Sequence, residues 1–106
     1  MIDIGIVYYR MGCAENTIDA IWYTSRLDKK DIGKGIARGD TSNGFPWDYV
    51  VTYSYPDGSE AGTFDLKIRK TGPVYDLSYS KDGKLLFLGV GIDTSDGMAA
   101  GYRKNE

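Results

Sequence analysis

The chain of 106 residues contains no histidine. That absence removes the Ser-His-Asp and Cys-His nucleophilic systems, the commonest general base and the usual ligands of catalytic zinc. Cysteine is almost as scarce: Cys13 stands alone, so no intrachain disulfide can form and an oxidising compartment is not implied. These absences therefore exclude most familiar hydrolase and metalloenzyme mechanisms, and we expect neither a metal nor a cofactor.

An excess of charge of one sign is also lacking. The 13 basic and 15 acidic residues give a net charge of −2, which provides no basic surface for a nucleic-acid backbone or an anionic membrane. No stretch approaches the ~20 apolar residues of a membrane-spanning helix. The start, Met1-Ile2-Asp3-Ile4-Gly5, has the pattern of a strand and not of a signal peptide. We expect a cytoplasmic protein that binds neither nucleic acid nor membrane.

Alternation of apolar and polar residues is the strongest local pattern that is present. Phe64, Leu66 and Ile68 share one face of an extended segment, while the residues between them are charged. Turn sequences such as Pro56-Asp57-Gly58 separate these segments. The pattern predicts eight strands, near residues 2–10, 17–24, 31–38, 46–55, 61–70, 74–80, 84–93 and 97–103.

An internal repeat suggests how the strands are organised. Tyr23 matches Tyr79, and the pair Gly33 and Gly35 matches Gly89 and Gly91, at a constant separation of 56 residues. We therefore expect one domain of two similar halves, approximately 1–45 and 46–106. Short hairpin links favour an eight-stranded antiparallel up-and-down barrel, with a two-sheet β-sandwich as the alternative. The glycine pairs are expected to serve bending or close packing, because no helix follows them to form a phosphate site.

The second half of the chain carries a diffuse pattern of structural glycines and tyrosines. The segments that carry this pattern are Tyr53-x-x-Pro-Asp-Gly-Ser, Gly62-Thr63-x-x-Leu-x-Ile, Gly72-x-Val-Tyr-x-Leu-x-Tyr, Gly89-x-Gly-Ile and Met98-Ala-Ala-Gly-Tyr. The pattern resembles uncharacterised small bacterial β-barrel proteins similar in architecture to the calycins (lipocalins and avidins). The resemblance covers about 60 residues and implies a fold without any catalytic residue.

Aromatic residues are plentiful and suggest a ligand site inside the barrel. Inward rings with polar tips line cavities for apolar or aromatic ligands in small barrels, although the same rings also fill cores. We expect a non-enzymatic binding module for a small apolar ligand or a protein partner. The alternatives are a small isomerase- or cyclase-like enzyme using Tyr and Asp/Glu as acid and base, and a structural or regulatory protein with a filled barrel. The candidate lining residues are Trp22, Tyr23, Trp47, Tyr49, Tyr53, Tyr75 and Tyr79.

One run breaks the alternation. Leu85, Leu86, Phe87 and Leu88 are four consecutive large apolar residues within one expected strand. A single-layer barrel must expose either Leu86 and Leu88 or else Leu85 and Phe87, and an apolar patch on a surface often marks an interface. We therefore expect a homodimer that uses the outer face of segment 84–93.

Overall fold

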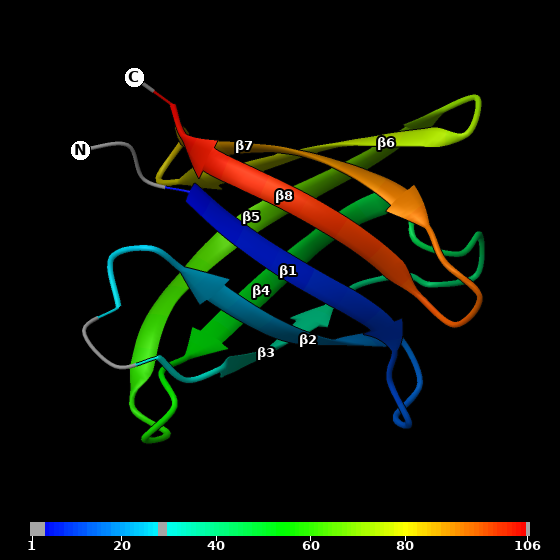
Figure 1. The fold of residues 1–106 in the computed structure, drawn as a ribbon. Coiled ribbons are helices and arrows are strands. Elements are labelled where there is room, and N and C mark those ends of the chain that lie inside the picture. Colours follow the sequence, from blue (N-terminus) through cyan, green and yellow to red (C-terminus); the bar gives the residue numbers. More distant parts are fainter. Residues whose placement is uncertain (1–3, 28–29, 106) are drawn as a thin grey trace.

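The computed structural model describes residues 4–27 and 30–105, which form strands joined by turns and loops (Figure 1). The strands coincide with the predicted segments to within a few residues at each end, except that residues 2 and 3 of the first predicted segment lie outside the described residues. No helix in these described ranges is long and apolar enough to cross a membrane. The strands are β1 (Ile4–Met11), β2 (Thr17–Thr24), β3 (Gly33–Arg38), β4 (Trp47–Ser54), β5 (Glu60–Thr71), β6 (Val74–Lys81), β7 (Lys84–Asp93) and β8 (Met98–Lys104).

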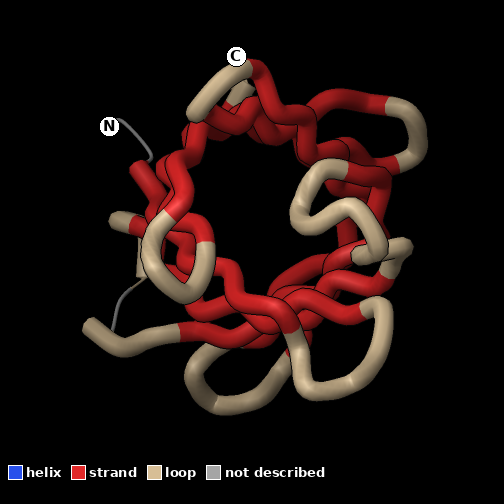
Figure 2. Tube along the Cα trace, turned by 90° about the vertical axis from the view of Figure 1, so that its right-hand side faces the viewer, coloured by secondary structure: helices blue, strands red, loops and turns tan. Residues whose placement is uncertain are grey.

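The strands form a closed antiparallel barrel. Each strand pairs with the next along the chain, and β8 pairs with β1 to close the sheet. The predicted up-and-down barrel is therefore confirmed, and the sandwich alternative is wrong. Seen along the barrel axis, the strands make a continuous ring (Figure 2). We call the end where β1 begins and β2 ends the open end, and the opposite end the closed end.

The half of the barrel near the closed end is filled by side chains. Alternate residues of each strand face inward, because successive side chains of a strand point to opposite faces. Loop 39–46 helps to close this end: Phe45 is buried, its ring meets that of Tyr75 edge to face at 6.1 Å, and Tyr49 donates a hydrogen bond of 2.8 Å to the Phe45 carbonyl. The largest fully buried side chains are Tyr9, Ile18, Val51, Leu66, Ile68, Leu77 and Met98.

Several glycines face the interior opposite an aromatic residue on the neighbouring strand. Gly33 pairs with Trp22, and a Cβ atom added to Gly33 would lie 2.3 Å from the indole ring. Gly5 pairs with Tyr102 and would place its Cβ atom 2.1 Å from that ring. The absent side chains leave space for rings to lie flat against the strand backbone, which protects the glycine from solvent. Close packing therefore accounts for these glycines.

The internal repeat is only partly reproduced in space. Gly33 and Gly35 face the interior, as does Gly91 of the second half, whose added Cβ atom would lie 2.7 Å from the sulfur of buried Met98. Tyr79 also faces inward, whereas Tyr23 lies on the outer surface beside buried Trp22. The expectation that Tyr23 occupies the place of Tyr79 is therefore wrong. A shift of one residue reverses the face on which a side chain lies.

Replacing Gly89 with alanine is expected to lower the free energy of unfolding by about 1–3 kcal/mol, as other overpacking substitutions do. The new Cβ atom would lie 2.8 Å from the carbonyl oxygen of Gly101, which belongs to the sheet backbone and cannot move away cheaply. Gly91→Ala is the matched comparison, because the atom closest to its Cβ belongs to the flexible side chain of Met98. Urea unfolding should rank Gly89→Ala as the more destabilised variant, and the reverse order would contradict this reading.

Candidate functional site

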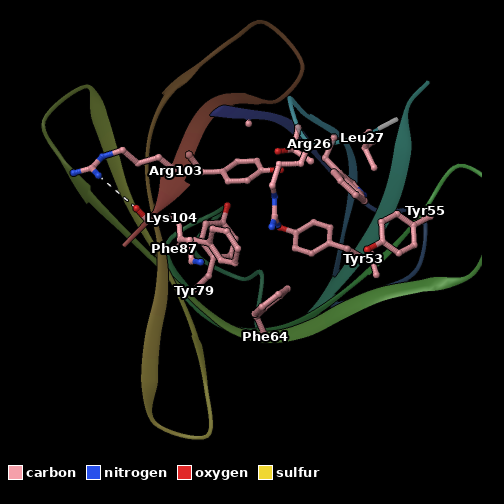
Figure 3. Close-up of a pocket in the computed structure, with 14 residues that line it drawn as sticks. Arg26, Leu27, Tyr53, Tyr55, Phe64, Tyr79, Phe87, Arg103 and Lys104 are labelled. Atoms are coloured by element: carbon pink, nitrogen blue, oxygen red, sulfur yellow. Dashed lines mark hydrogen bonds between the residues drawn. The ribbon is translucent and has the colours of Figure 1, made fainter. Parts of the chain in front are cut away.

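A cavity of about 410 Å³ lies inside the barrel at the open end (Figure 3). Its wall combines side chains from β2, β4, β5, β6, β7 and β8 with residues of the loops at that end. Half of the lining residues are aromatic, and three basic residues lie toward the opening. The lining residues are Gly5, Trp22, Thr24, Arg26, Leu27, Tyr53, Tyr55, Ala61, Phe64, Tyr79, Phe87, Tyr102, Arg103 and Lys104.

Two irregularities in strand pairing lie at this end of the barrel. The register between β4 and β5 shifts at Tyr53/Ser54, and that between β6 and β7 shifts at Tyr79/Ser80. A bulge bends a strand and increases its local twist. Each shift follows a tyrosine that lines the cavity. The tight turn after β6 helps to place the second bulge, since Asp82 and Gly83 both have positive φ angles (52° and 79°), as a two-residue hairpin turn requires.

The rings of the wall support one another from the sides. Phe87 meets Phe64 edge to face at 5.7 Å and Tyr102 at 6.0 Å, while Trp22 meets Tyr53 at 5.9 Å across the wall. The Trp22 indole nitrogen also donates a hydrogen bond of 2.9 Å to the Lys34 carbonyl. Edge-to-face contacts are favourable for aromatic pairs. Rings that pack against one another in this way remain at the wall and leave the centre of the cavity open.

Three phenol groups meet at the inner end of the cavity. The Tyr9 hydroxyl lies 2.5 Å from the hydroxyl of Tyr53 and 2.7 Å from that of Tyr79. Burial raises the pKa of Tyr79 to about 12, and it raises the pKa of Tyr9 and of Tyr53 well above their usual value near 10, helped by repulsion between neighbouring phenolates. All three hydroxyls are therefore neutral at ordinary pH. We call Tyr9, Tyr53 and Tyr79 the phenol cluster.

The opening of the cavity is basic. The Arg26 side chain lies over the space between the rings, whereas the Arg103 guanidinium points away from it and donates a hydrogen bond of 3.4 Å to the Lys104 carbonyl (Figure 3). Arg26 lies close enough to Tyr102 to offset part of the rise that burial causes in the pKa of that tyrosine. Within the described residues, no carboxylate lines the cavity. The site thus offers apolar surface, phenol hydroxyls and cations.

The structure brings together three of the seven candidate lining residues: Trp22, Tyr53 and Tyr79. Tyr49 and Tyr75 also face inward, but they are buried near the closed end, where Tyr75 donates a hydrogen bond of 2.7 Å to Asp93. The other two candidates lie elsewhere, and the expectation for them is corrected.

Tyr23 lies on the outer surface, where its hydroxyl accepts a hydrogen bond of 3.1 Å from Lys30. Trp47 is 48% exposed at the start of β4, at the closed end of the barrel. Trp47 lies on the face of β4 that alternation predicts. The end of β4 that carries it, however, extends beyond the enclosed part of the barrel. Alternation gives the face of a residue and not its height along the barrel axis.

The apolar run of β7 does not lie on one surface. Phe87 lines the cavity, so its assignment to an interface is corrected, whereas Leu88 is 37% exposed on the outer face. Leu85 and Leu86 are half-buried beside the bulge, and their carbonyls accept hydrogen bonds from Asn105 at 3.4 and 2.8 Å.

Other lining residues were missed from the sequence. For Phe64 the sequence did contain a signal, because Phe64 alternates with Leu66 and Ile68 and therefore shares the inner face of β5 with them. Tyr102 had another, because it continues the alternation of Met98 and Ala100 along the last expected strand. Arg26 had none, because it belongs to a loop without periodic pattern.

No family model, curated protein or solved structure matches this chain. In the described ranges, no group of three or more His, Cys, Asp or Glu side chains is placed to hold a metal ion. The functional proposals below therefore rest on the geometry of the cavity and of the outer surface.

Raising the pH from about 10 to about 12 is expected to lower the free energy of unfolding. The unfolded chain releases tyrosine protons near pH 10, whereas folded Tyr79 keeps its proton until about pH 12, so the folded state binds more protons in this window. Each such group contributes about 1.4 kcal/mol per pH unit. Urea unfolding across this range measures the slope, and Tyr79→Phe should make it shallower. An equal slope in the two proteins would contradict the assignment.

Proposed function

We propose that this protein is a non-enzymatic binding module that takes a small apolar ligand into the barrel cavity. The cavity itself carries the proposal: a space of about 410 Å³ enclosed by rings and open at one end is within the usual range of ligand pockets. A structural protein with a filled barrel would not leave this space. The closed eight-stranded barrel is also compatible with the calycin-like fold that the sequence resembles.

The enzyme alternative has less support. Acid–base chemistry of the kind expected would pair a tyrosine with a buried carboxylate facing the cavity. The described lining residues include tyrosines but neither Asp nor Glu. The raised pKa values of the phenol cluster also make these tyrosines poor bases at neutral pH. We therefore favour binding over catalysis. The cytoplasmic location stays a prediction, which the free and exposed Cys13 supports.

A neutral fluorescent probe, N-phenyl-1-naphthylamine, is expected to bind the protein saturably with one probe per barrel. Ala61→Trp should abolish this binding, because the indole is added at a position that lines the cavity. Lys67→Trp is the matched control, since it places the same ring at an exposed position of the same strand. Fluorescence titration gives the answer. Equal binding by both variants, or none by the unaltered protein, would contradict the proposed cavity site.

We further propose that the protein forms a homodimer through one side of the barrel. The outer apolar face consists of exposed branched side chains on neighbouring strands, with Ala99 and Gly101 of β8 between them. Pairing places Val90 and Ile6 on either side of Gly101, and Ile92 beside Ala99. The seven branched residues of this face are Ile4, Ile6, Ile21, Val74, Leu88, Val90 and Ile92, which are 37–65% exposed.

A second copy of the chain fits this face better than an unrelated partner. The small residues Ala99 and Gly101 form a furrow between raised side chains, and a shallow groove of about 310 Å³ continues it past Val74, Val90 and Ile92. The raised branched side chains and the furrow lie on the same surface of the barrel. A twofold contact requires this arrangement, because each copy must supply both parts of the interface. Seven half-exposed side chains present on the order of 600–800 Å², close to the ~800 Å² that each partner buries in a standard interface.

Light scattering at tens of micromolar is expected to give twice the monomer mass of 11.7 kDa. Val90→Lys should produce a folded monomer, because a charge placed on the outer apolar face cannot be buried without a partner. Val50→Lys is the control: Val50 is 51% exposed on the outer surface of β4, away from this face, and its replacement should leave the dimer intact. A monomer mass for the unaltered protein would defeat the proposal.

A further inference from the structure

The two ends of the cavity differ in charge, and the inner end is neutral. Tyr9 bonds to Tyr53 and Tyr79 at 2.5 and 2.7 Å, and Tyr53 and Tyr79 also share a side-chain hydrogen bond. Each hydroxyl of the phenol cluster can therefore donate to one neighbour and accept from the other. Because the three hydroxyls satisfy one another and stay protonated, the inner end suits the apolar part of a ligand.

Arg26 supplies a positive charge above this space. It belongs to the loop between β2 and β3, and its side chain lies over the space between the rings (Figure 3). Its charge also acts on Tyr102, another residue of the wall. Arg26 already has an interaction within the chain, but a guanidinium carries five N–H donors in a planar fork that matches a carboxylate. It can therefore hold a ligand oxygen as well as a protein partner.

Lys104 supplies a second positive charge at the rim. Along β8, Met98 and Ala100 are buried and Tyr102 lines the cavity, so Lys104 continues the same inner face. Its partner on β7 is Phe87, whose ring belongs to the wall. Residues directly opposite each other in an antiparallel pair lie on one face of the sheet. Lys104 is therefore placed beside the Phe87 ring, at the inside of the opening.

The described carboxylates at the open end do not balance these cations from within the cavity. Asp31 accepts a hydrogen bond of 2.8 Å from the backbone of the next residue, and Asp57 accepts two from Ser59 at 2.8 and 2.6 Å. Glu60 is exposed at the start of β5, and Asp82 lies in the turn after β6. None of these carboxylates lines the cavity, so every charged residue in its described lining is basic.

Resting on the proposed binding function, we propose that the ligand is an apolar monocarboxylate that keeps its carboxylate at the opening, in contact with Arg26 and Lys104. The aromatic wall packs against the apolar body. A carboxylate at the opening keeps part of its hydration, whereas the same group at the inner end would lose its water without meeting a cation. The ligand therefore enters with its apolar end first.

Three naphthalene derivatives of similar size test this proposal. 2-Naphthylacetate, 2-naphthylacetamide and 2-(2-naphthyl)ethylammonium carry a negative, a neutral and a positive group, and each is titrated at neutral pH against bound N-phenyl-1-naphthylamine. A cavity without cations would prefer the amide, because the carboxylate loses more hydration on entry. We expect the unaltered protein to bind the carboxylate about tenfold more tightly than the amide, the size of one charge-assisted hydrogen bond. The ammonium compound should bind most weakly.

In the variant Arg26→Gln/Lys104→Gln, the preference for the carboxylate over the amide should disappear. The affinity for the amide should stay within about twofold of that of the unaltered protein, because the aromatic wall is unchanged. The control Lys34→Gln/Lys67→Gln removes two cations from exposed, outward-facing positions of β3 and β5 and should keep the preference. An equal preference in the two double variants would overturn the assignment to Arg26 and Lys104.

The unaltered protein also gives an answer that needs no variant. If it binds the amide as tightly as the carboxylate, or more tightly, the proposal is overturned while cavity binding stands, even if the variant Arg26→Gln/Lys104→Gln does not fold. Failure of the fluorescent probe to bind the unaltered protein would instead overturn the binding function itself.

Discussion

The hydrogen-bonded pairing of β1 with β8 is the contact on which the rest of the structure depends. Because it closes the sheet, the interior becomes a limited volume that side chains from all eight strands must share. Near the closed end, aliphatic residues such as Leu66, Ile68 and Leu77 fill this volume. Toward the open end, rings that lean on one another occupy the wall and leave the centre empty. The cavity is therefore a product of closure combined with aromatic packing.

Much of the fold could be predicted from the sequence because its signals are local. Strands are indicated by alternation along β5 and β6, and hairpins by the turn residues around Gly58 and Gly83. Each signal lies within a few residues of the structure that it specifies. The face on which a residue lies also follows from alternation, but only once the register is known. Tyr23 and Tyr79 show the limit: the repeat aligned them, yet a difference of one residue places them on opposite sides of the wall.

The site was less predictable because it depends on relations between distant segments. Tyr9, Tyr53 and Tyr79 come from β1, β4 and β6, and nothing in their spacing indicates that their hydroxyls meet. Phe87 faces the cavity because it continues the inward alternation of Gly89 and Gly91, although it belongs to a run of four apolar residues. Trp47 was placed on the correct face of its strand, but it lies beyond the enclosed part of the barrel. Height along the axis needs the tilt and stagger of the whole sheet.

The division of the interior into a filled half and a hollow half separates two tasks that small proteins often combine. The aliphatic residues near the closed end hold the fold together, and the rings at the open end determine what fits inside. Exchanging Phe64 or Phe87 for a smaller or larger residue would reshape the hollow half while the filled half stays intact. A barrel of this kind can therefore change its ligand during evolution through a few substitutions, while the protein encoded at each intermediate step still folds.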